Sequence, residues 1–284
     1  MQQGMLFHGF DRCDPGVDVQ QVLCTLSEPL DVAQFLAAWN VVISRYDILR
    51  TSFEWEGRPE PVQRVQRSVD LPVNVLDFTN TPSSEHRDRI ARLMAEDRAT
   101  GFDLSAAPLM RLTIVSCGPS AFQVLWTFHH AILDGRSFPI LLREIFAVYE
   151  AIVAGRPLTL AQPKQYRSYI EWLQAQDPER SRNFWKHRLA RCKWPTPLVG
   201  SVRGGSGAGL GRVELNLTED ETHALQTFAR TAQCTLGTLV TAAWALLLSR
   251  YTGEGDVLFG VTRACRHPTI DGAGEMVGLF VHTL

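Results

Sequence analysis

Residues 126–135 read Trp126-Thr127-Phe128-His129-His130-Ala131-Ile132-Leu133-Asp134-Gly135. The apolar run from Phe122 to Phe128 is rich in aromatic and β-branched residues and predicts a buried strand. After the histidines, residues 138–153 carry apolar side chains at helical spacing. The two histidines therefore occupy a strand-to-helix connection. There a rigid strand aims their side chains, and the start of the helix supplies free N–H groups and positive partial charge.

The residue types in this connection fit a catalytic site. Neighbouring histidines on an extended chain point to opposite faces, so His130 can face a cavity while His129 anchors the backbone. Imidazole is the side chain best placed to move a proton near neutral pH. Asp134 can pin an imidazole, cap the helix or pair with an arginine, and Gly135 permits a backbone geometry denied to other residues. Each residue alone has an ordinary structural interpretation, but together they indicate a site.

Composition argues against several classes of function. The 284 residues are 45% apolar and carry a net charge of −2, which suits one large or two modest domains with a substantial core. Acidic and basic residues are interspersed, which argues against a nucleic-acid or membrane surface held by bulk charge. No stretch is long and apolar enough to span a bilayer, and the first residues lack the pattern of a signal peptide. We therefore expect a cytoplasmic protein with neither nucleic acid nor membrane as a partner.

The cysteines predict neither a disulfide framework nor a zinc site. They are scattered and form no C-x-x-C pair, so reduced thiols are the expected state. They are Cys13, Cys24, Cys117, Cys192, Cys234 and Cys265. A metal site made of His129, His130 and Asp134 is disfavoured because adjacent histidines rarely bind one ion. We expect no metal.

Patterns elsewhere predict further strands and helices around this stretch. Strands are expected at 17–26, 49–55, 62–65, 73–76, 109–116, 121–128, 212–217, 256–262 and 277–284. Helices are expected after Asp31, at 82–100, 138–153, 166–176 and 180–192, after Thr218, and at 236–251. Asp31 is a predicted N-cap, and Thr218 with Glu221 a predicted capping box. The apolar helix 236–251 is expected to be buried. The Gly-rich residues 194–211 are expected to form a flexible linker or a mobile loop, not a phosphate loop.

Five motifs, in order, resemble those of the condensation domain of nonribosomal peptide synthetases. Residues 129–135 match the H-H-x-x-x-D-G signature of that family. Residues 45–53 resemble its R-H-E-x-L-R-T-x-F motif, with Tyr46 in place of the usual His. Residues 277–284 resemble its G-x-F-x-N-T motif, with His282 where Asn is usual. Residues 2–8 and 166–172 resemble two more motifs, so the resemblance covers the whole chain.

The resemblance implies an α/β (α+β) fold similar to chloramphenicol acetyltransferase, with two lobes in a V and a tunnel at their junction. We expect residues 1–176 to form the N-terminal lobe, which carries the histidine motif. We expect residues 177–284 to form an incomplete C-terminal lobe, because the motifs stop inside that lobe of the family.

The resemblance also implies partners. Donor and acceptor peptidyl carrier proteins are expected to dock at opposite mouths of the tunnel, with adenylation and carrier domains adjacent in the synthetase. The domain itself is expected to bind no cofactor directly. Its substrates would arrive on the phosphopantetheine arms of the carrier proteins, and the acceptor amine would attack the donor thioester to form an amide.

The needs of this reaction suggest a role for each residue of the stretch. His130 is expected to contact the nucleophile, as proton acceptor or as positioner, with His129 packed behind it and the Gly135 N–H directed at the oxyanion. Asp134 either assists the imidazole or holds the loop through Arg266, which lies in a stretch that resembles the family's G-R-x-P; the family favours the second role. Residues at other motif positions are expected to support the site by packing and ion pairing, and these are Arg45, Arg50 and Trp185.

Two alternative functions stay open. One is an acyltransferase of the same fold that makes an ester or uses acyl-coenzyme A, because the histidine motif by itself also fits wider relatives. The other is a non-catalytic module that docks carrier proteins, although such relatives usually lose the second His. An epimerising relative shares the histidine motif, whereas the heterocyclising branch carries Asp in place of both histidines.

Overall fold

The computed structural model describes residues 2–10, 16–190 and 213–283. The elements that precede the histidine motif are α1 Gln2–Phe10, β1 Val19–Leu26, α2 Val32–Arg45, η1 Asp47–Arg50, β2 Thr51–Glu54, β3 Val62–Val65, β4 Val73–Asp77, α3 Ser83–Thr100, β5 Met110–Gly118 and β6 Ala121–His129. The elements that follow it are α4 Ser137–Val153, α5 Arg167–Gln174, α6 Pro178–Leu189, α7 Glu219–Thr231, α8 Leu236–Thr252, β7 Thr262–Ala264, η2 Ala273–Glu275 and β8 Val281–Thr283.

A four-stranded sheet in the order β1-β6-β5-β4 carries the histidine motif. Strands β5 and β6 form the predicted antiparallel hairpin, with Gly118 opposite Ala121. Strand β1 is antiparallel to β6, and β4 is parallel to β5. Because side chains alternate along a strand, Trp126 and Phe128 face one side of the sheet, and Thr127 and His129 face the other.

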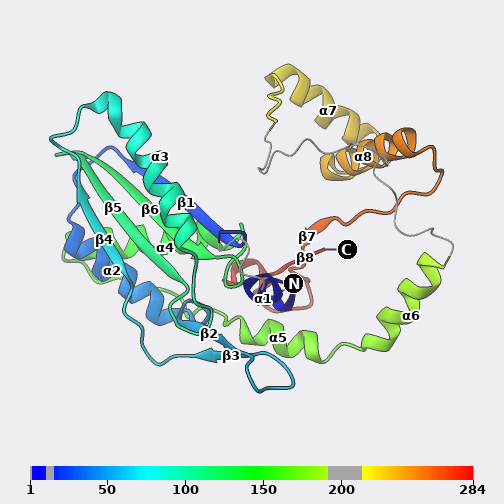
Figure 1. Cartoon of the computed structure of the whole chain (residues 1–284), viewed down its shortest axis with the longest axis horizontal. Helices are drawn as coiled ribbons and strands as arrows, with labels where there is room; N and C mark the ends of the chain where they lie inside the picture. The colour runs from blue at the N-terminus through cyan, green and yellow to red at the C-terminus, as the bar shows by residue number, and fades with distance from the viewer. Residues whose placement is uncertain (1, 11–15, 191–212, 284) are drawn as a thin grey trace. The chain divides into compact units, whose positions relative to one another are not determined.

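Helices cover both faces of this sheet. Helices α2 and α4 pack together on one face and α3 lies on the other (Figure 1). Helix α2 begins where the sequence predicts, because the Asp31 carboxylate accepts a hydrogen bond from the Gln34 N–H at 3.0 Å. Its apolar stripe is buried against the sheet, with Trp39 edge-on to Trp126 at 5.2 Å between ring centroids. The main core therefore lies between the α2–α4 layer and the sheet.

Polar contacts rather than a wide apolar stripe hold α3 on the opposite face. The Arg111 guanidinium of β5 donates to the Asp97 carboxylate at 2.6 Å and to the Gly101 carbonyl at 2.8 Å. The Gln21 amide of β1 donates to the other oxygen of Asp97 at 2.9 Å. These contacts lower the pKa of Asp97, although its partial burial alone would raise it. The C-terminal turn of α3 is therefore attached to β1 and β5, the two strands that flank β6.

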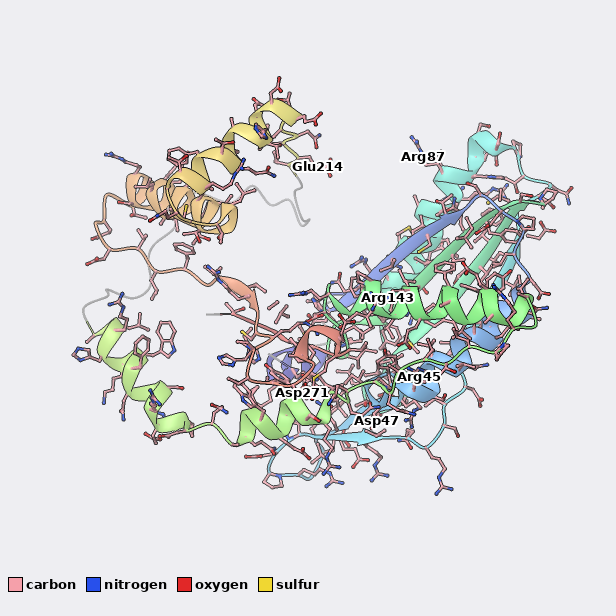
Figure 2. All side chains as sticks on the ribbon, turned by 180° about the vertical axis from the view of Figure 1, so that it is seen from behind. Arg45, Asp47, Arg87, Arg143, Glu214 and Asp271 are labelled. Atoms are coloured by element: carbon pink, nitrogen blue, oxygen red, sulfur yellow. The ribbon has the colours of Figure 1, made fainter. Side chains whose placement is uncertain are left out.

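The C-terminal end of α2 is joined to α4 by a cluster that contains the unusual Tyr46. The Tyr46 hydroxyl donates to Glu144 at 2.9 Å, and the Arg45 Nε lies 3.1 Å from the same carboxylate. Burial, followed by the neighbouring Glu144, raises the pKa of Tyr46. Arg45 is labelled in Figure 2, with Asp47 just beyond it. This cluster fixes the angle between the two helices that cover the core.

The chain divides into two compact units. One comprises Met1–Gln176 with Thr262–Leu284, and the other comprises Asp177–Val261. The sequence-based division instead gives residues 1–176 to one lobe and residues 177–284 to the other. That division assigns Thr262–Leu284 to the second lobe, yet this segment belongs to the first unit. The assignment of residues 1–176 and 177–284 to two lobes stays a prediction.

The second unit contains α6, α7 and α8. The capping box predicted at Thr218 and Glu221 is present at the start of α7. The expected burial of the apolar helix 236–251 is wrong for the described chain, because Leu248 is the buried residue of α8 while Trp244 and Leu246 are 44% and 65% exposed. The apolar residues of this segment form a helix whose backbone is satisfied internally, but burial of that helix needs a partner surface.

Four of the predicted strands are wrong or differ in their bounds. Within the expected strand 212–217, the described residues 213–217 form no strand, and Val213 is 97% exposed. The expected strand 256–262 is wrong except at its last residue, because β7 is Thr262–Ala264, and the expected strand 277–284 shortens to β8. Among the described residues, β7 and β8 pair with each other in a two-stranded sheet. The expected strand 49–55 begins as the short helix η1 and becomes β2 at Thr51. The predicted linker 194–211 lies outside the described residues.

In the described part of the chain, no single helix is long and apolar enough to cross a membrane. Only the pair α7 and α8, bent by 94°, passes that test by combined length and composition.

Candidate functional site

The turn from His130 to Asp134 connects β6 to α4. The His129 N–H donates to the Leu109 carbonyl at 3.0 Å and closes the β5–β6 ladder. The next N–H, that of His130, donates to the Asp18 carbonyl at 2.7 Å, just before β1. Beyond this point the chain leaves the sheet, and the Ile132 N–H donates back to the His129 carbonyl at 3.2 Å instead of to a neighbouring strand. The sheet thus holds the base of the turn from both sides.

His129 is a buried, neutral anchor. Its side chain is 7% exposed, and Nδ1 accepts a hydrogen bond from the Ala131 N–H at 3.1 Å. The Phe102 ring lies edge-on to it at 6.4 Å. Burial penalises the charged imidazole and lowers the pKa of His129 to about 4. The structure therefore places His129 as the sequence predicts, packed beneath the turn that carries His130 and anchoring its backbone.

His130 presents one nitrogen that has no partner among the described residues. Its ring is partly buried, and Nδ1 lies 2.7 Å from the Leu133 carbonyl. A carbonyl oxygen can only accept, so Nδ1 carries the proton, and in the neutral ring Nε2 carries the lone pair. The turn therefore selects the tautomer in which Nε2 is able to accept a proton or a hydrogen bond.

Asp134 holds the loop and forms the predicted pair with Arg266. The Arg266 Nη2 lies 2.9 Å from the Asp134 carboxylate, and the two side chains are 3% and 1% exposed. The same carboxylate accepts from the Ser137 N–H at 3.1 Å and from the Phe280 N–H at 3.1 Å. Within the described residues, none of its hydrogen bonds goes to an imidazole. The contacts are therefore those of the loop-holding role, not those of direct assistance to His130.

Arg266 extends this network to the segment before β8. It donates to the carbonyls of Ala273 and Met276 at 2.7 and 2.6 Å, and its guanidinium lies 4.0 Å from the centre of the Phe280 ring. Salt bridges add to the attachment of this segment at the surface. They join Arg143 to Glu275 and Lys164 to Asp271, and Arg143 and Asp271 are labelled in Figure 2.

Ser137 and Gly278 are site residues that the sequence analysis missed. The fully buried Ser137 hydroxyl accepts from the Gly278 N–H at 3.1 Å and lies 2.9 Å from both the Asp134 carboxylate and the Gly278 carbonyl. A Ser three residues after Asp134, at the start of a helix, is a capping pattern that would have indicated Ser137. Gly278 is the glycine of the stretch that resembles the G-x-F-x-N-T motif, but the motif by itself gave this glycine no place in the site. Its position depends on the buried Tyr166 ring, which would lie 2.1 Å from an added Cβ.

Gly135 is exposed, and in the described residues its N–H has no hydrogen-bond partner. Its φ does not lie in the left-handed region, so the expected need for a special backbone geometry is not met. A Cβ added there would meet nothing within 4 Å. An N–H that is free at the start of α4 suits an incoming oxyanion, since the helix terminus adds positive partial charge.

The three residues expected to support the site lie outside this turn. Arg45 bonds to Glu144, as described above. Arg50 lies 2.6 Å from the Asp47 carboxylate and also donates to the Arg67 carbonyl at 3.2 Å. Trp185 belongs to α6 of the second unit, where it is 43% exposed and edge-on to Phe184. Their contacts are structural, and a role in support of the site stays a prediction for each.

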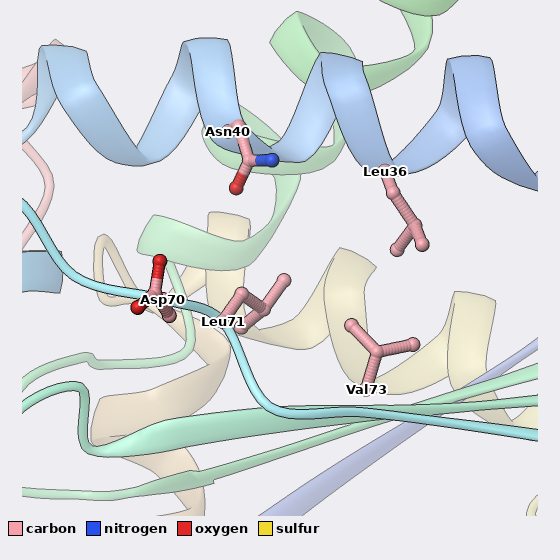
Figure 3. Close-up of a pocket in the computed structure, with 5 residues that line it drawn as sticks. All are labelled: Leu36, Asn40, Asp70, Leu71 and Val73. Atoms are coloured by element: carbon pink, nitrogen blue, oxygen red, sulfur yellow. The ribbon is translucent and has the colours of Figure 1, made fainter.

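A separate pocket lies on the α2 side of the sheet (Figure 3). It has a volume of about 190 Å³, and its lining consists of Leu36, Asn40, Asp70, Leu71 and Val73. None of these residues belongs to the histidine turn. In the part of the chain that the structure describes, no group of three His, Cys, Asp or Glu side chains is arranged to hold a metal ion.

Two adjacent histidines end the hairpin, the buried Asp134–Arg266 pair lies behind them, and among the described residues the Gly135 N–H has no hydrogen-bond partner. The family model of the condensation domain matches residues 1–284. The chain therefore belongs to the condensation-domain family, whose members are acyltransferases that form amide bonds. The expected family, fold class and enzyme class are confirmed.

Similar proteins include several peptide synthetases. The chain is 40% identical to a linear gramicidin synthase of Brevibacillus parabrevis and 32% identical to bacitracin synthase 3 of Bacillus licheniformis, in each case over its whole length. It spans only 4% of the length of each of these relatives.

Solved structures confirm the fold. The first condensation domain of the CDA synthetase matches with a TM-score of 0.77 at 22% identity. The starter condensation domain of rhizomide synthetase matches with a TM-score of 0.78 at 21% identity. The chain is covered completely in both matches and spans 67% and 63% of those structures.

Proposed function

We propose that this domain forms an amide bond between a donor thioester and the amine of an acceptor, each carried on the phosphopantetheine arm of a carrier protein. Family membership gives the reaction class, and the relatives are peptide synthetases. The observation that carries the assignment to this turn is the His130 ring. Its Nδ1 is occupied by the Leu133 carbonyl, and its Nε2 is left with a lone pair.

The proposed reaction is an aminolysis. The acceptor nitrogen attacks the thioester carbon, the C–S bond breaks, and the amine proton passes through His130 to the departing thiolate. A thioester is already reactive, so the alignment of two tethered substrates supplies much of the acceleration. His130 Nε2 accepts a hydrogen bond from the amine and then receives its proton. The Gly135 N–H donates to the tetrahedral oxyanion.

Asp134 and Arg266 keep the turn in place without entering the chemistry. The donor and acceptor carrier proteins, with neighbouring adenylation and carrier domains, are the proposed partners. We propose no cofactor bound by the domain itself. We also propose that Arg45, Arg50 and Trp185 act only through packing and ion pairing.

The test compares the wild type and His130→Ala in the whole protein. The probes are a panel of carrier proteins loaded with aminoacyl donors and acceptors, and the amide product is detected by mass. Removal of a proton acceptor is expected to lower the rate by about 10²- to 10⁴-fold. The matched control is His223→Ala, because His223 is an exposed histidine on α7, and it is expected to leave the rate unchanged.

Other outcomes distinguish the alternatives. Equal product from the wild type and His130→Ala would contradict the catalytic role of His130, and no product from either protein would favour a docking module. Product formed from acyl-coenzyme A but not from acyl-carrier protein, or an ester in place of an amide, would contradict the proposed substrates while retaining the acyltransferase class.

A further inference from the structure

The N–H and the carbonyl of Ala131 each form a hydrogen bond with a side chain. The residue itself is fully buried, so its N–H and carbonyl both need partners. The Ala131 N–H donates to the His129 ring, and its carbonyl accepts from the Gln2 side-chain amide at 2.9 Å. Ala131 follows His130 directly. These two contacts therefore fix the first step of the turn that carries His130.

Gln2 is itself held by a second glutamine. The Gln63 amide of β3 donates to the Gln2 Oε1 at 2.7 Å. The donor and acceptor of both hydrogen bonds are fixed. The Ala131 carbonyl can only accept, so it needs the NH₂ group of Gln2, and the Gln2 Oε1 can only accept, so it needs the NH₂ group of Gln63. The Gln2 amide therefore has one orientation, with NH₂ toward the turn and oxygen toward Gln63. Three segments that are far apart in the sequence meet at this one side chain.

Both glutamines are attached to packed elements. Helix α1 is anchored by Met5 and Leu6, which are 7% and 3% exposed. Gln63 lies opposite Phe53 in the β2–β3 pair, and Phe53 is 1% exposed. The chain of hydrogen bonds thus begins on fixed structure and ends on the turn, where Leu133, two residues after Ala131, accepts from His130 Nδ1.

We propose that Gln2, oriented by Gln63, is a positioning residue for His130. By holding the Ala131 carbonyl, it keeps the Leu133 carbonyl at the distance that retains the proton on Nδ1 and aims Nε2 at the substrate. This inference rests on the proposed function, because it gives Gln2 a part in that same reaction. Gln2 acts through the backbone and does not touch the reacting atoms.

The decisive variant is Gln2→Glu. It is isosteric and keeps an acceptor for Gln63, but it puts an oxygen where the donor to Ala131 stood. We expect kcat to fall at least about fivefold, as for the loss of one hydrogen bond, with KM unchanged. We also expect the ¹⁵N shifts of the His130 ring to change from a single Nδ1–H tautomer to a mixture. The matched control is Gln3→Glu, because Gln3 is the neighbouring, exposed glutamine of α1.

A second variant keeps the test valid if Gln2→Glu destabilises the fold. Gln63→Leu leaves Gln2 in place but removes the group that orients it, so a smaller loss of kcat is expected. The double variant should lose no more than Gln2→Glu alone, because the two residues act in series. Circular dichroism and the midpoint of thermal unfolding establish that each variant is folded.

The outcomes separate this inference from the proposed function. A Gln2→Glu protein with wild-type kcat and a single His130 tautomer would overturn the positioning role, even where His130→Ala abolishes turnover. Conversely, full activity of His130→Ala would overturn the proposed function. The tautomer measurement needs no substrate and would still decide whether Gln2 sets the state of His130.

Discussion

His129 and His130 are consecutive residues with opposite environments. His129 belongs to β6 and faces the side of the sheet that α3 covers, where burial and Phe102 keep it neutral. His130 has left the sheet, and only one of its ring nitrogens is occupied by a partner in the described chain. One step along the backbone therefore separates an anchor from a reactive group.

Burial of His129 predicts a loss of stability in acid. Its pKa is about 6.5 in the unfolded chain and about 4 in the fold. As the pH falls from 6.5 to 4, His129 binds a proton in the unfolded chain but stays neutral in the folded chain. The free energy of unfolding should therefore decrease through this window, by up to about 3 kcal/mol from this residue. Urea denaturation at a series of pH values measures it.

His129→Asn is the control for this effect. The Asn side chain can still accept from the Ala131 N–H but does not titrate, so the part of the pH dependence due to residue 129 should disappear. An unchanged slope between pH 6.5 and 4 in the variant would show that other groups are responsible.

The buried Asp134–Arg266 pair predicts that Asp134→Ala lowers soluble yield as much as activity. Removal of the carboxylate leaves a charged guanidinium without its counter-ion in a site where its side chain is 3% exposed. The expected cost is about 3 to 5 kcal/mol. Chemical denaturation and the yield of soluble protein are the measurements.

The double variant Asp134→Ala with Arg266→Met removes the uncompensated charge and should recover part of the lost stability. A fully stable but slow Asp134→Ala protein would instead indicate that Asp134 acts on the chemistry.

At the scale of elements, the site depends on the segment before β8 as much as on the β5–β6 hairpin. The Asp134 N–H donates to the Gly278 carbonyl at 3.1 Å, and the Tyr166 hydroxyl donates to the Leu279 carbonyl at 2.6 Å. The Tyr169 ring lies 4.5 Å from Phe280. The start of α4, helix α5 and this segment therefore form one packed unit behind the histidine turn.

This packing predicts that Gly278→Ala is destabilising. An added Cβ would lie 2.1 Å from the Tyr166 ring, and Tyr166 is buried and tied to Leu279. Forcing a methyl group into such a site costs about 1 to 3 kcal/mol. The control is Gly274→Ala, where an added Cβ meets nothing within 4 Å. Thermal unfolding of the two variants should differ, and equal midpoints would contradict the close packing at Gly278.

At the scale of the whole molecule, the two units are packed to different degrees. Strands β5 and β6 carry long runs of buried side chains, whereas α7 and α8 each have one buried residue, Ala229 and Leu248. Local stability follows buried apolar contact. We therefore expect amide hydrogens of α7 and α8 in the 284-residue chain to exchange faster than those of β5 and β6. Equal protection in both units, measured by mass spectrometry, would contradict this expectation.

Sequence alone determined the elements whose cause is local. The β5–β6 hairpin follows from two apolar runs around a turn, helix α2 from its Asp31 cap and apolar stripe, and helix α7 from its capping box. The identity of the histidine turn was equally readable, because a short motif carries it. These features depend on residues a few positions apart, which sequence periodicity records.

Tertiary structure alone decided how the site is held. The hydrogen bond from Gln2 to the Ala131 carbonyl and the close approach of Tyr166 to Gly278 each join segments that lie far apart in the chain. The failed strand at 213–217 and the exposed α8 have the same cause. A helix forms its backbone hydrogen bonds within itself. Strands need a neighbouring strand, and buried faces and catalytic turns need contacts from other segments, which a local sequence pattern does not identify.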